Sequence, residues 1–198
     1  MSTHTEQKPK LLIYSDTWRI PSGFSSEIKP LLPFLQNAFD VHYLGIFDDR
    51  DTATPVKTYG ACALPQHKND FFGIQRLTEA INGIRPDIIF CNQDLQVVDN
   101  VSRISAESRI PFINWDIIDC EKLPKQFVQL CLNIDWHIYQ TQFTKKAIET
   151  IHYLKAMDRP VIYPPINQAY FEAKKSSKSF DSKKRILCVA KNIPRKFL

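Results

Sequence analysis

The chain of 198 residues is long enough for one domain with a substantial core and a shorter additional piece. Its residues are 43% apolar and 24% charged, which is typical of a soluble globular protein. Residues 1–173 carry 17 basic and 20 acidic side chains, a net charge of −3, whereas residues 174–198 carry nine and one, a net charge of +8. The mildly acidic body gives no reason to expect nucleic acid as a partner, and no apolar run reaches the ~20 residues of a membrane helix.

The first half of the chain is expected to alternate between strands and helices. Strands are expected at Lys10–Asp16, Phe39–Phe47, Thr58–Leu64 and Arg85–Asp94, and helices at Ser22–Phe39 and Asp70–Gly83. Pro30 and Pro33 must start or kink the first helix, because proline lacks the N–H that a helix interior needs.

The second half continues the alternation. Helices are expected at Val97–Ser108, Pro124–Leu132 and Phe143–Leu154, and strands at Ile110–Ile118, Asp135–Thr141 and Pro160–Ile166. Such alternation predicts an α/β, Rossmann-like domain: a parallel sheet with helices on both faces. We expect this domain to span residues 10–173, after a disordered N-terminus at residues 1–9.

The basic C-terminal part divides into two segments. Residues 174–184 are polar and strongly charged, which indicates a solvated linker; peripheral contact with an anionic membrane surface is the alternative. The strand-like run Arg185–Ala190 then leads into a cationic loop, and we expect residues 185–198 to begin a truncated second domain.

The cysteines and histidines indicate a reducing compartment and no metal site. The polar start of the chain lacks the apolar core of a secretory signal. The cysteine number is odd and no CxxC spacing occurs, so buried reduced thiols in a cytoplasmic protein are expected; these are Cys62, Cys91, Cys120, Cys131 and Cys188. The histidines have no metal-ligand spacing, no metal or cofactor is expected, and His137 is interpreted as a sheet residue.

Polar residues follow several of the predicted strands. In an open parallel sheet, ligands bind beyond the carboxyl ends of the strands. The residues to weigh there are Asp16, Asn92, Asp94, Asp116, Asp119, Thr141 and Gln142. Each of them is equally suited to cap a helix or form a turn, so their recurrence supports a polar ligand site only collectively.

Two loops are candidate anion sites. Ser22 and Gly23 lie between the first strand and its helix, where a glycine lets the backbone approach a phosphate or sugar, although an ordinary turn explains them equally well. Lys191, Arg195 and Lys196 cluster around one proline after a strand, where cations would stabilise the charge of a leaving diphosphate; a basic surface turn is the alternative.

Several segments in the same order resemble the family 4 type of GT-B glycosyltransferases, which have two Rossmann-like domains facing a cleft. The similar segments are Ser22–Ser25, Asp70–Asp94, Ile110–Cys120, Asp135–Ile148, Pro160–Phe171 and the final RILCVAKNIPRKFL. The likeness is collective and covers nearly the whole chain from Lys10 onward. It implies the N-terminal half of a GT-B fold with the first strand and loop of the C-terminal domain.

The resemblance also implies roles for single residues. Gly23 would lie near the donor phosphates or the acceptor, Asp119 would face the cleft, and Lys191 with Lys196 would hold the donor diphosphate. Lys191 stands where the family usually has arginine, so it keeps the charge but loses the bidentate fork. The usual crossover glycine is also replaced, by Pro165 or Asn167.

The resemblance implies the N-terminal domain of a retaining glycosyltransferase that moves a sugar from a nucleotide-diphosphate sugar to a carbohydrate, lipid or protein acceptor. Without the missing C-terminal domain, we expect this fragment to be inactive and to bind a nucleotide sugar weakly or not at all. One alternative is a non-catalytic regulatory half that pairs with a separate donor-binding subunit, which the coding sequence beyond Leu198 would discriminate. Another is a GT-B-like sugar-nucleotide epimerase, for which Asp94 and Asp119 are the acid and base candidates.

Overall fold

The computed structural model describes residues 7–18, 21–46, 56–58, 61–65, 70, 72–119, 126–150 and 158–165. The chain divides into two compact units after Ile166, and every described residue belongs to the first unit. The predicted linker at 174–184, the predicted second-domain start at 185–198 and its cations Lys191, Arg195 and Lys196 lie outside the described residues.

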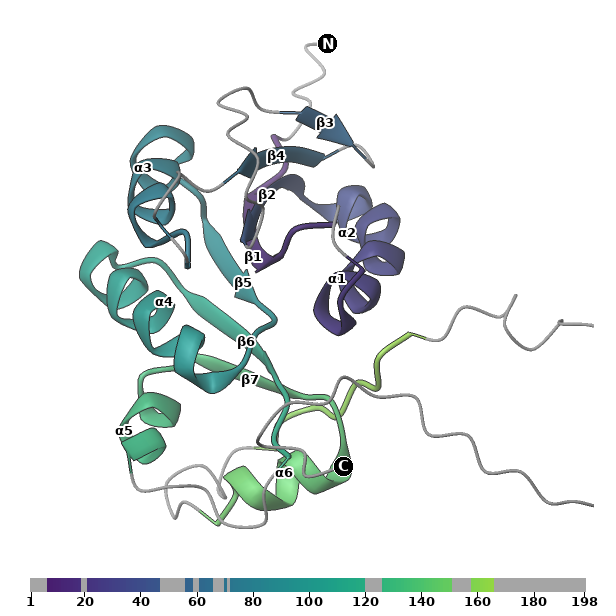
Figure 1. Ribbon diagram of the computed structural model, residues 1–198, viewed down its shortest axis with the longest axis vertical. Coiled ribbons are helices and arrows are strands. Elements are labelled where there is room, and N and C mark those ends of the chain that lie inside the picture. The colour runs from purple at the N-terminus through teal and green to yellow at the C-terminus, as the bar shows by residue number, and fades with distance from the viewer. Residues whose placement is uncertain are drawn as a thin grey trace, which may run out of the picture. The chain divides into compact units, whose positions relative to one another are not determined.

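A seven-stranded sheet forms the centre of the first unit (Figure 1). Its strands are β1 (Lys10–Asp16), β2 (Asp40–Ile46), β3 (Val56–Thr58), β4 (Ala61–Pro65), β5 (Ile88–Cys91), β6 (Phe112–Asp116) and β7 (Trp136–Tyr139). They lie in the order β3-β4-β2-β1-β5-β6-β7. Neighbours pair in parallel except at the β3 edge, where β3 runs antiparallel to β4. The predicted parallel sheet is therefore confirmed.

Helices cover both faces of the sheet. They are α1 (Gly23–Ile28), α2 (Leu32–Ala38), α3 (Ile74–Ile84), α4 (Leu95–Ser108), α5 (Gln126–Leu132) and α6 (Gln142–Ile148). In Figure 1, α1 and α2 lie on one side of the central strands, and α3, α4 and α5 lie on the other. The predicted arrangement with helices on both faces is confirmed.

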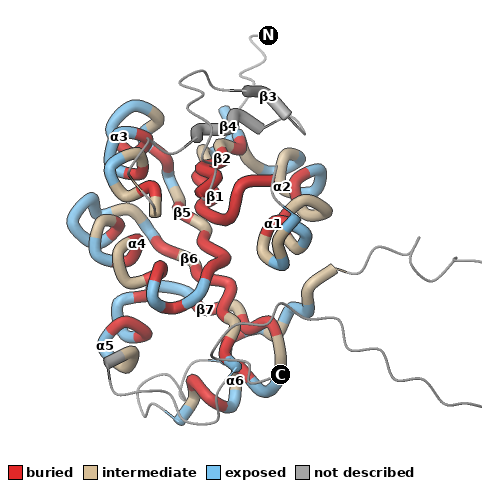
Figure 2. Tube along the Cα trace, viewed as in Figure 1, coloured by how far each residue is buried: buried red, intermediate tan, exposed pale blue. Residues whose placement is uncertain are grey.

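Two apolar clusters follow from the alternation of side chains along the strands. On β1, Leu12 and Tyr14 pack into the larger cluster with α3, α4, α5 and α6, whereas Leu11 and Ile13 pack into the smaller one with α1 and α2. Figure 2 shows the buried residues concentrated on the central strands. Because β1 has neighbours on both edges and helices on both faces, its run of apolar residues is completely buried.

Prolines divide the first predicted helix. The segment Ser22–Phe39 folds as α1, a 3-10 turn at Lys29–Leu31 and α2. Pro30 and Pro33 lie at the starts of the turn and of α2, where the missing N–H costs no helical hydrogen bond. The expected kink is confirmed.

Two strand predictions need correction. The run Thr58–Leu64 was expected as one strand, but Thr58 ends β3 and Leu64 lies in β4, which pairs antiparallel with β3. The run Pro160–Ile166 was expected as a strand, but among the described residues it makes a single bridge, between Val161 and Tyr139. Apolar composition alone does not distinguish a ladder from one bridge, because pairing depends on the neighbouring strand.

Candidate functional site

The order of the strands reverses direction between β1 and β5, which is where open α/β sheets bind ligands at the carboxyl edge. Side chains join the ends of these two strands. The Gln93 amide Nε2 donates to Asp16 Oδ1 at 2.5 Å, and Ser15 Oγ donates to the Asn92 carbonyl oxygen at 3.0 Å. All four of these residues are buried. The predicted strand-end residues Asp16 and Asn92 therefore do lie together at the switch point.

A second polar group lies beside the first and joins α1 to the ends of β5 and β7. Oε2 of Glu27 accepts from Asn92 Nδ2 at 2.9 Å and from Gln140 Nε2 at 3.0 Å. Gln140 Nε2 also donates to Asn92 Oδ1 at 3.0 Å. The two amides are buried, at 0% and 1% exposure, whereas Glu27 is half-buried. We call Glu27, Asn92 and Gln140 the edge triad.

The loop between β1 and α1 is anchored to β2. The Tyr43 hydroxyl donates to the Asp16 carbonyl oxygen at 2.6 Å, and the Trp18 ring packs against the Tyr43 ring with centroids 4.7 Å apart. The Thr17 N–H donates to the Ile46 carbonyl oxygen at 2.8 Å. A Cβ on Gly45 would lie 2.8 Å from Thr17 Cα, so only glycine permits this close approach. These contacts hold Asp16 in place.

Ser22 and Gly23, the predicted phosphate or sugar loop, form the start of α1. Ser22 Oγ accepts from the Ser25 N–H, and Ser25 Oγ accepts from the Ser22 N–H, which completes a capping box. A Cβ on Gly23 would meet nothing within 4 Å, so packing does not require glycine there. The loop therefore has a clear structural role in starting α1, and its contact with a ligand remains a prediction.

Asp94 and Asp119 lie beyond the ends of the adjacent strands β5 and β6, and both are exposed. Asp94 is the N-cap residue of α4, and its carbonyl oxygen accepts from the Val97 N–H at 2.8 Å. The structure thus places both predicted catalytic candidates at the carboxyl edge. Whether either one takes part in catalysis remains a prediction.

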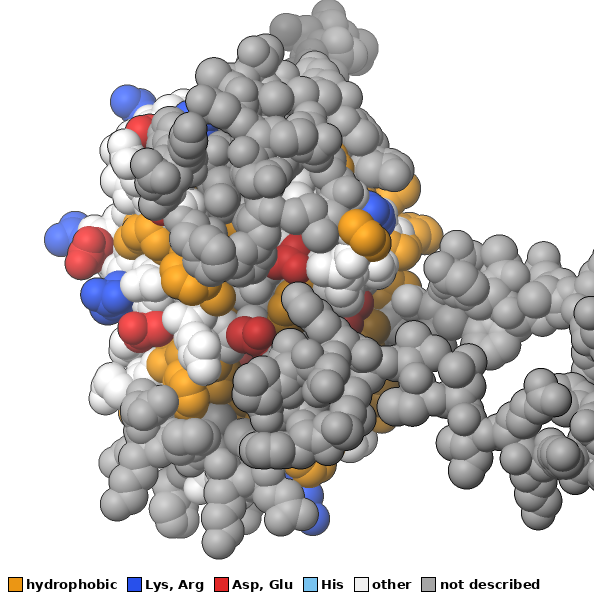
Figure 3. Space-filling view, viewed as in Figure 1, with side chains coloured by type: hydrophobic (Ala, Val, Ile, Leu, Met, Phe, Trp, Pro, Cys, Tyr) orange, Lys and Arg blue, Asp and Glu red, His pale blue; other side chains and the backbone are white. Residues whose placement is uncertain are grey.

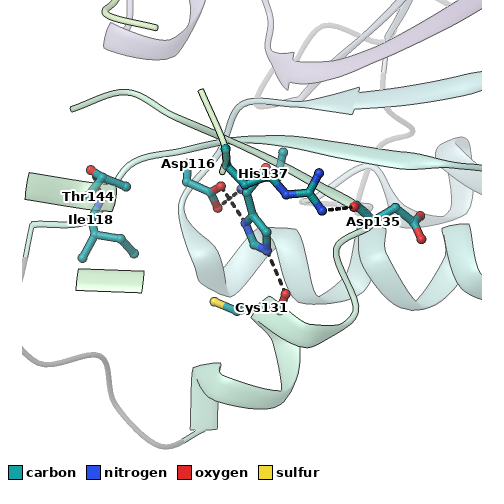
Figure 4. Close-up of polar contacts among 8 residues, drawn as sticks. Asp116, Ile118, Cys131, Asp135, His137 and Thr144 are labelled. Carbon is teal, nitrogen blue, oxygen red and sulfur yellow. Dashed lines mark hydrogen bonds and ion pairs between the residues drawn. The ribbon is translucent and has the colours of Figure 1, made fainter. Parts of the chain in front are cut away.

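Asp116, at the end of β6, is completely buried. Its Oδ2 lies 2.8 Å from His137 Nδ1, and its Oδ1 accepts from Asn114 Nδ2 at 2.7 Å (Figure 4). His137 Nε2 lies 2.8 Å from the Cys131 carbonyl oxygen on α5. Asp116 and His137 are completely buried, so the expectation that Asp116 belongs to a polar ligand site needs correction. The carboxylate is instead engaged by groups inside the core.

The hydrogen bonds of His137 indicate a charged imidazolium. Both ring nitrogens face groups that only accept, a carboxylate and a carbonyl, so both nitrogens must donate. Burial by itself lowers the pKa of His137, but the charge of Asp116 and the hydrogen bonds to Asp116 and Cys131 outweigh it and raise the pKa above its ordinary value. The sheet position expected for His137 is confirmed, and the pair is a structural feature of the core.

Thr141 and the buried thiols also have structural roles. Thr141 Oγ1 accepts from the Thr144 N–H at 3.0 Å and caps α6.

Burial raises the pKa of the Cys131 thiol to about 12 and that of Cys91 well above its ordinary value, so neither thiol forms a reactive thiolate near neutral pH. Both cysteines are free and buried, as expected. The other three cysteines lie outside the residues whose side chains the structure describes.

Charge distinguishes the carboxyl edge. Its described segments are 16–18, 21–27, 92–94, 117–119 and 140–142, in which the charged side chains are Asp16, Glu27, Asp94 and Asp119. Figure 3 shows acidic side chains in the middle of the view and also at its left margin, beside lysine and arginine side chains. Across the described part of the chain, no group of three or more His, Cys, Asp or Glu residues is arranged to hold a metal ion. The described segments of this edge contain no lysine or arginine side chain.

Glu27, Gln93 and Gln140 are the edge residues that sequence reasoning missed. Gln93 and Gln140 adjoin the selected residues Asn92 and Thr141, but among the strand-end glutamines only Gln142 was selected. Glu27 lies inside a helical segment, where an acidic residue predicts only a solvated face. Strand-end position was the available signal for the two glutamines, whereas nothing local indicated Glu27.

An open groove of about 510 Å³ runs along α6 and includes Lys145, Lys146 and Glu149. The Lys145 ammonium lies 3.3 Å from Asp158 Oδ1 and 3.7 Å from Glu149 Oε1, and it donates to the Arg159 carbonyl oxygen. Because these acceptors already engage the ammonium, the groove is a weaker candidate than the carboxyl edge.

Several solved structures are similar to this chain. Alr3699/HepE from Anabaena in complex with UDP-glucose matches with a TM-score of 0.53 and 14% identity over 81% of this chain and 45% of that chain. The same protein in complex with UDP matches with a TM-score of 0.49 and 13% identity, over 83% and 46%. UDP-GlcNAc 2-epimerase from Neisseria meningitidis bound to UDP-GlcNAc matches with a TM-score of 0.47 and 13% identity, over 77% and 45%.

At these identities, the match to the UDP-glucose complex establishes the fold. The chain is an α/β protein with a Rossmann-like sheet, and it spans less than half the length of these structural neighbours. No protein-family profile and no curated protein sequence matches it. Among the described residues, no helix combines the length and the apolar character that crossing a membrane demands.

Proposed function

We propose that this chain is the acceptor-side half of a retaining glycosyltransferase of the GT-B type, which transfers a sugar from a nucleotide-diphosphate sugar to an acceptor. The observation that carries the proposal is the polar switch point, where Asp16 and Gln93 lie beside the edge triad. A fold of this kind is also found in a structure that binds UDP-glucose. The order of segments that resembles the GT-B family supports the same function.

The distribution of charge suggests that different parts of the chain bind the diphosphate and the rest of the substrates. A diphosphate needs cations, and the described carboxyl edge contributes acidic side chains. We therefore assign the donor diphosphate to Lys191, Arg195 and Lys196. Helix N-termini and these cations, with no metal, would stabilise the charge that develops on the leaving nucleoside diphosphate.

The residues of the first unit would face the sugar and the acceptor. Asp94 and Asp119 lie exposed at the carboxyl edge and are the proposed catalytic candidates. Ser22 and Gly23 would let the backbone approach the substrate at the start of α1, because nothing fills the space beside Gly23. The proposed acceptor is a carbohydrate, a lipid or a protein.

Titration of the full chain with UDP-glucose, followed by NMR, tests the location of the site. The side-chain amide signals of Asn92, Gln93 and Gln140 are expected to shift at millimolar ligand. Because the chain spans less than half of its neighbour, we expect a dissociation constant weaker than micromolar and no transfer by this chain alone. Backbone signals of Lys10 and Arg85, at the opposite edge of the sheet, should stay unchanged.

Two results would contradict the proposal. Shifts confined to the opposite edge would place the ligand elsewhere, and micromolar binding of UDP-glucose would show that the donor site is complete in this chain. Product analysis of the protein with a nucleotide sugar, with and without an acceptor, separates transfer from epimerisation: transfer consumes the acceptor, whereas epimerisation proceeds without it.

A further inference from the structure

The Glu27 carboxylate in the edge triad is oriented by two buried amides. Both amides, Asn92 Nδ2 and Gln140 Nε2, donate to the same oxygen, Oε2. Oε1 has no hydrogen-bond partner among the described residues, and the side chain is only half-buried. The triad therefore presents one carboxylate oxygen with its acceptor capacity unused, at the switch point of the sheet.

The triad is more than is needed to attach α1. Ile28 on α1 is completely buried in the smaller apolar cluster, and Ser25 is buried in the capping box at its start. Ordering a glutamate and a glutamine side chain loses rotamer freedom, which a purely apolar contact would avoid. Holding polar groups in one geometry is instead what a binding site requires, because preorganisation lowers the cost of binding.

The chemistry of the triad selects its ligand. Gln140 Nε2 uses both of its N–H groups, on Glu27 Oε2 and on Asn92 Oδ1, and Asn92 is completely buried, so the accessible group left open is an acceptor. The Asp16 carboxylate, which accepts from Gln93, lies at the same switch point as the Glu27 carboxylate. An anion would be repelled there, whereas a hydroxyl group donates well to a carboxylate.

We propose that Glu27, positioned by Asn92 and Gln140, binds a hydroxyl group of a neutral sugar, which is the acceptor of the proposed reaction. This inference rests on the proposed function for the identity of the ligand as acceptor. It commits the site to an uncharged sugar and excludes a sugar phosphate from the same position.

Titration of the full chain with methyl glycosides of glucose, galactose and mannose tests the proposal. At least one glycoside is expected to shift the side-chain amide signals of Asn92 and Gln140, and glucose 1-phosphate is expected to leave them unchanged. Glu27→Gln keeps the shape but replaces a charge-assisted hydrogen bond with a neutral one, so affinity should fall about tenfold. Glu107→Gln removes the same charge from an exposed position on α4 and should bind like wild type.

The outcomes separate this inference from the proposed function. Glycoside binding that depends on Glu27 supports the inference even if UDP-glucose fails to bind. If UDP-glucose binds at this edge but no glycoside shifts the triad at high millimolar concentration, the inference is wrong and the proposed function stands. Equal affinity of Glu27→Gln and Glu107→Gln, with both variants unfolding like wild type, would also overturn it, as would preferential binding of glucose 1-phosphate.

Discussion

Oδ2 of Asp116 lies 2.8 Å from Nδ1 of His137, and neither side chain has any exposed surface. The pair connects the adjacent strands β6 and β7, and His137 extends the contact to the Cys131 carbonyl on α5. Removing one partner of a buried ion pair leaves the other charge without compensation. The stability of this side of the sheet should therefore depend on both residues.

Asp116→Asn is expected to lower the free energy of unfolding by about 3 kcal/mol, because His137 loses its counter-charge. Urea denaturation followed by circular dichroism measures the change. Asp99→Asn is the matched control: Asp99 pairs with Arg103 at 3.6 Å on the surface of α4 and should cost less than about 1 kcal/mol. Equal effects of the two substitutions would show that the buried pair contributes no more than the surface pair.

The raised pKa of His137 predicts how stability changes with pH. Burial lowers this pKa, but Asp116 and the two hydrogen bonds raise it more, so the folded pKa lies above the unfolded value of 6.5. The stabilisation is fully present below the unfolded pKa and is lost as the pH rises through the folded pKa. His137→Gln should therefore lose more stability near pH 6 than in the alkaline range.

Urea titrations of wild type, His137→Gln and Asp116→Asn at several pH values measure this difference. Arg159, which opposes the raised pKa of His137, stays in place in all three proteins. Asp116→Asn removes the main cause of the raised pKa and should show the same flattened dependence as His137→Gln. A stability difference between wild type and His137→Gln that is constant with pH would contradict the assignment of a charged His137.

Gly45→Ala is expected to destabilise the protein by about 1–3 kcal/mol, since the added Cβ would lie 2.8 Å from Thr17 Cα. The neighbour is backbone and must move, which would displace the loop after Asp16. Gly83→Ala is the control: a Cβ there meets nothing within 4 Å, and alanine should stabilise α3 by about 0.5–1 kcal/mol. Thermal unfolding of both variants gives the sign of each effect. If Gly45→Ala left the stability unchanged, the loop after Asp16 would have to shift without cost.

Tyr43→Phe is expected to cost about 1–3 kcal/mol, because it removes the 2.6 Å hydrogen bond to the buried Asp16 carbonyl oxygen. The same variant should weaken binding at the switch point, since that bond helps to position Asp16. Tyr163→Phe, at a position that is 61% exposed, should leave both stability and binding unchanged. Denaturation and the UDP-glucose titration together measure both effects; a loss of stability without weaker binding would show that the loop geometry is kept.

The fold could be predicted well because its signals are local. The segment Lys10–Asp16 forms a strand with the predicted bounds, and the other strands of the parallel sheet lie within or close to their predicted ranges. Pro30 and Pro33 broke the first helix as their missing N–H groups require. The strand prediction for Pro160–Ile166 was wrong, because an apolar run indicates burial but does not show how many hydrogen bonds a neighbouring strand supplies.

The candidate site could be predicted only in outline. Position at a strand end correctly selected Asp16 and Asn92. The same criterion selected Asp116, which instead forms an ion pair with His137 inside the core. Asp, Asn and Thr look alike in sequence whether they cap a helix, pair in the core or face a ligand. What separates these outcomes is the partner, which local sequence does not specify.

By itself, the sequence determined the alternation of strands and helices, and with it a Rossmann-like sheet, because periodicity and proline act within a few residues. Only the tertiary structure decided which polar groups meet. Glu27 and Gln140 are 113 residues apart, and they share a hydrogen bond because the strand order places the end of β7 near α1. A buried polar side chain must find a partner, and the chain supplies it through the packing of the whole sheet.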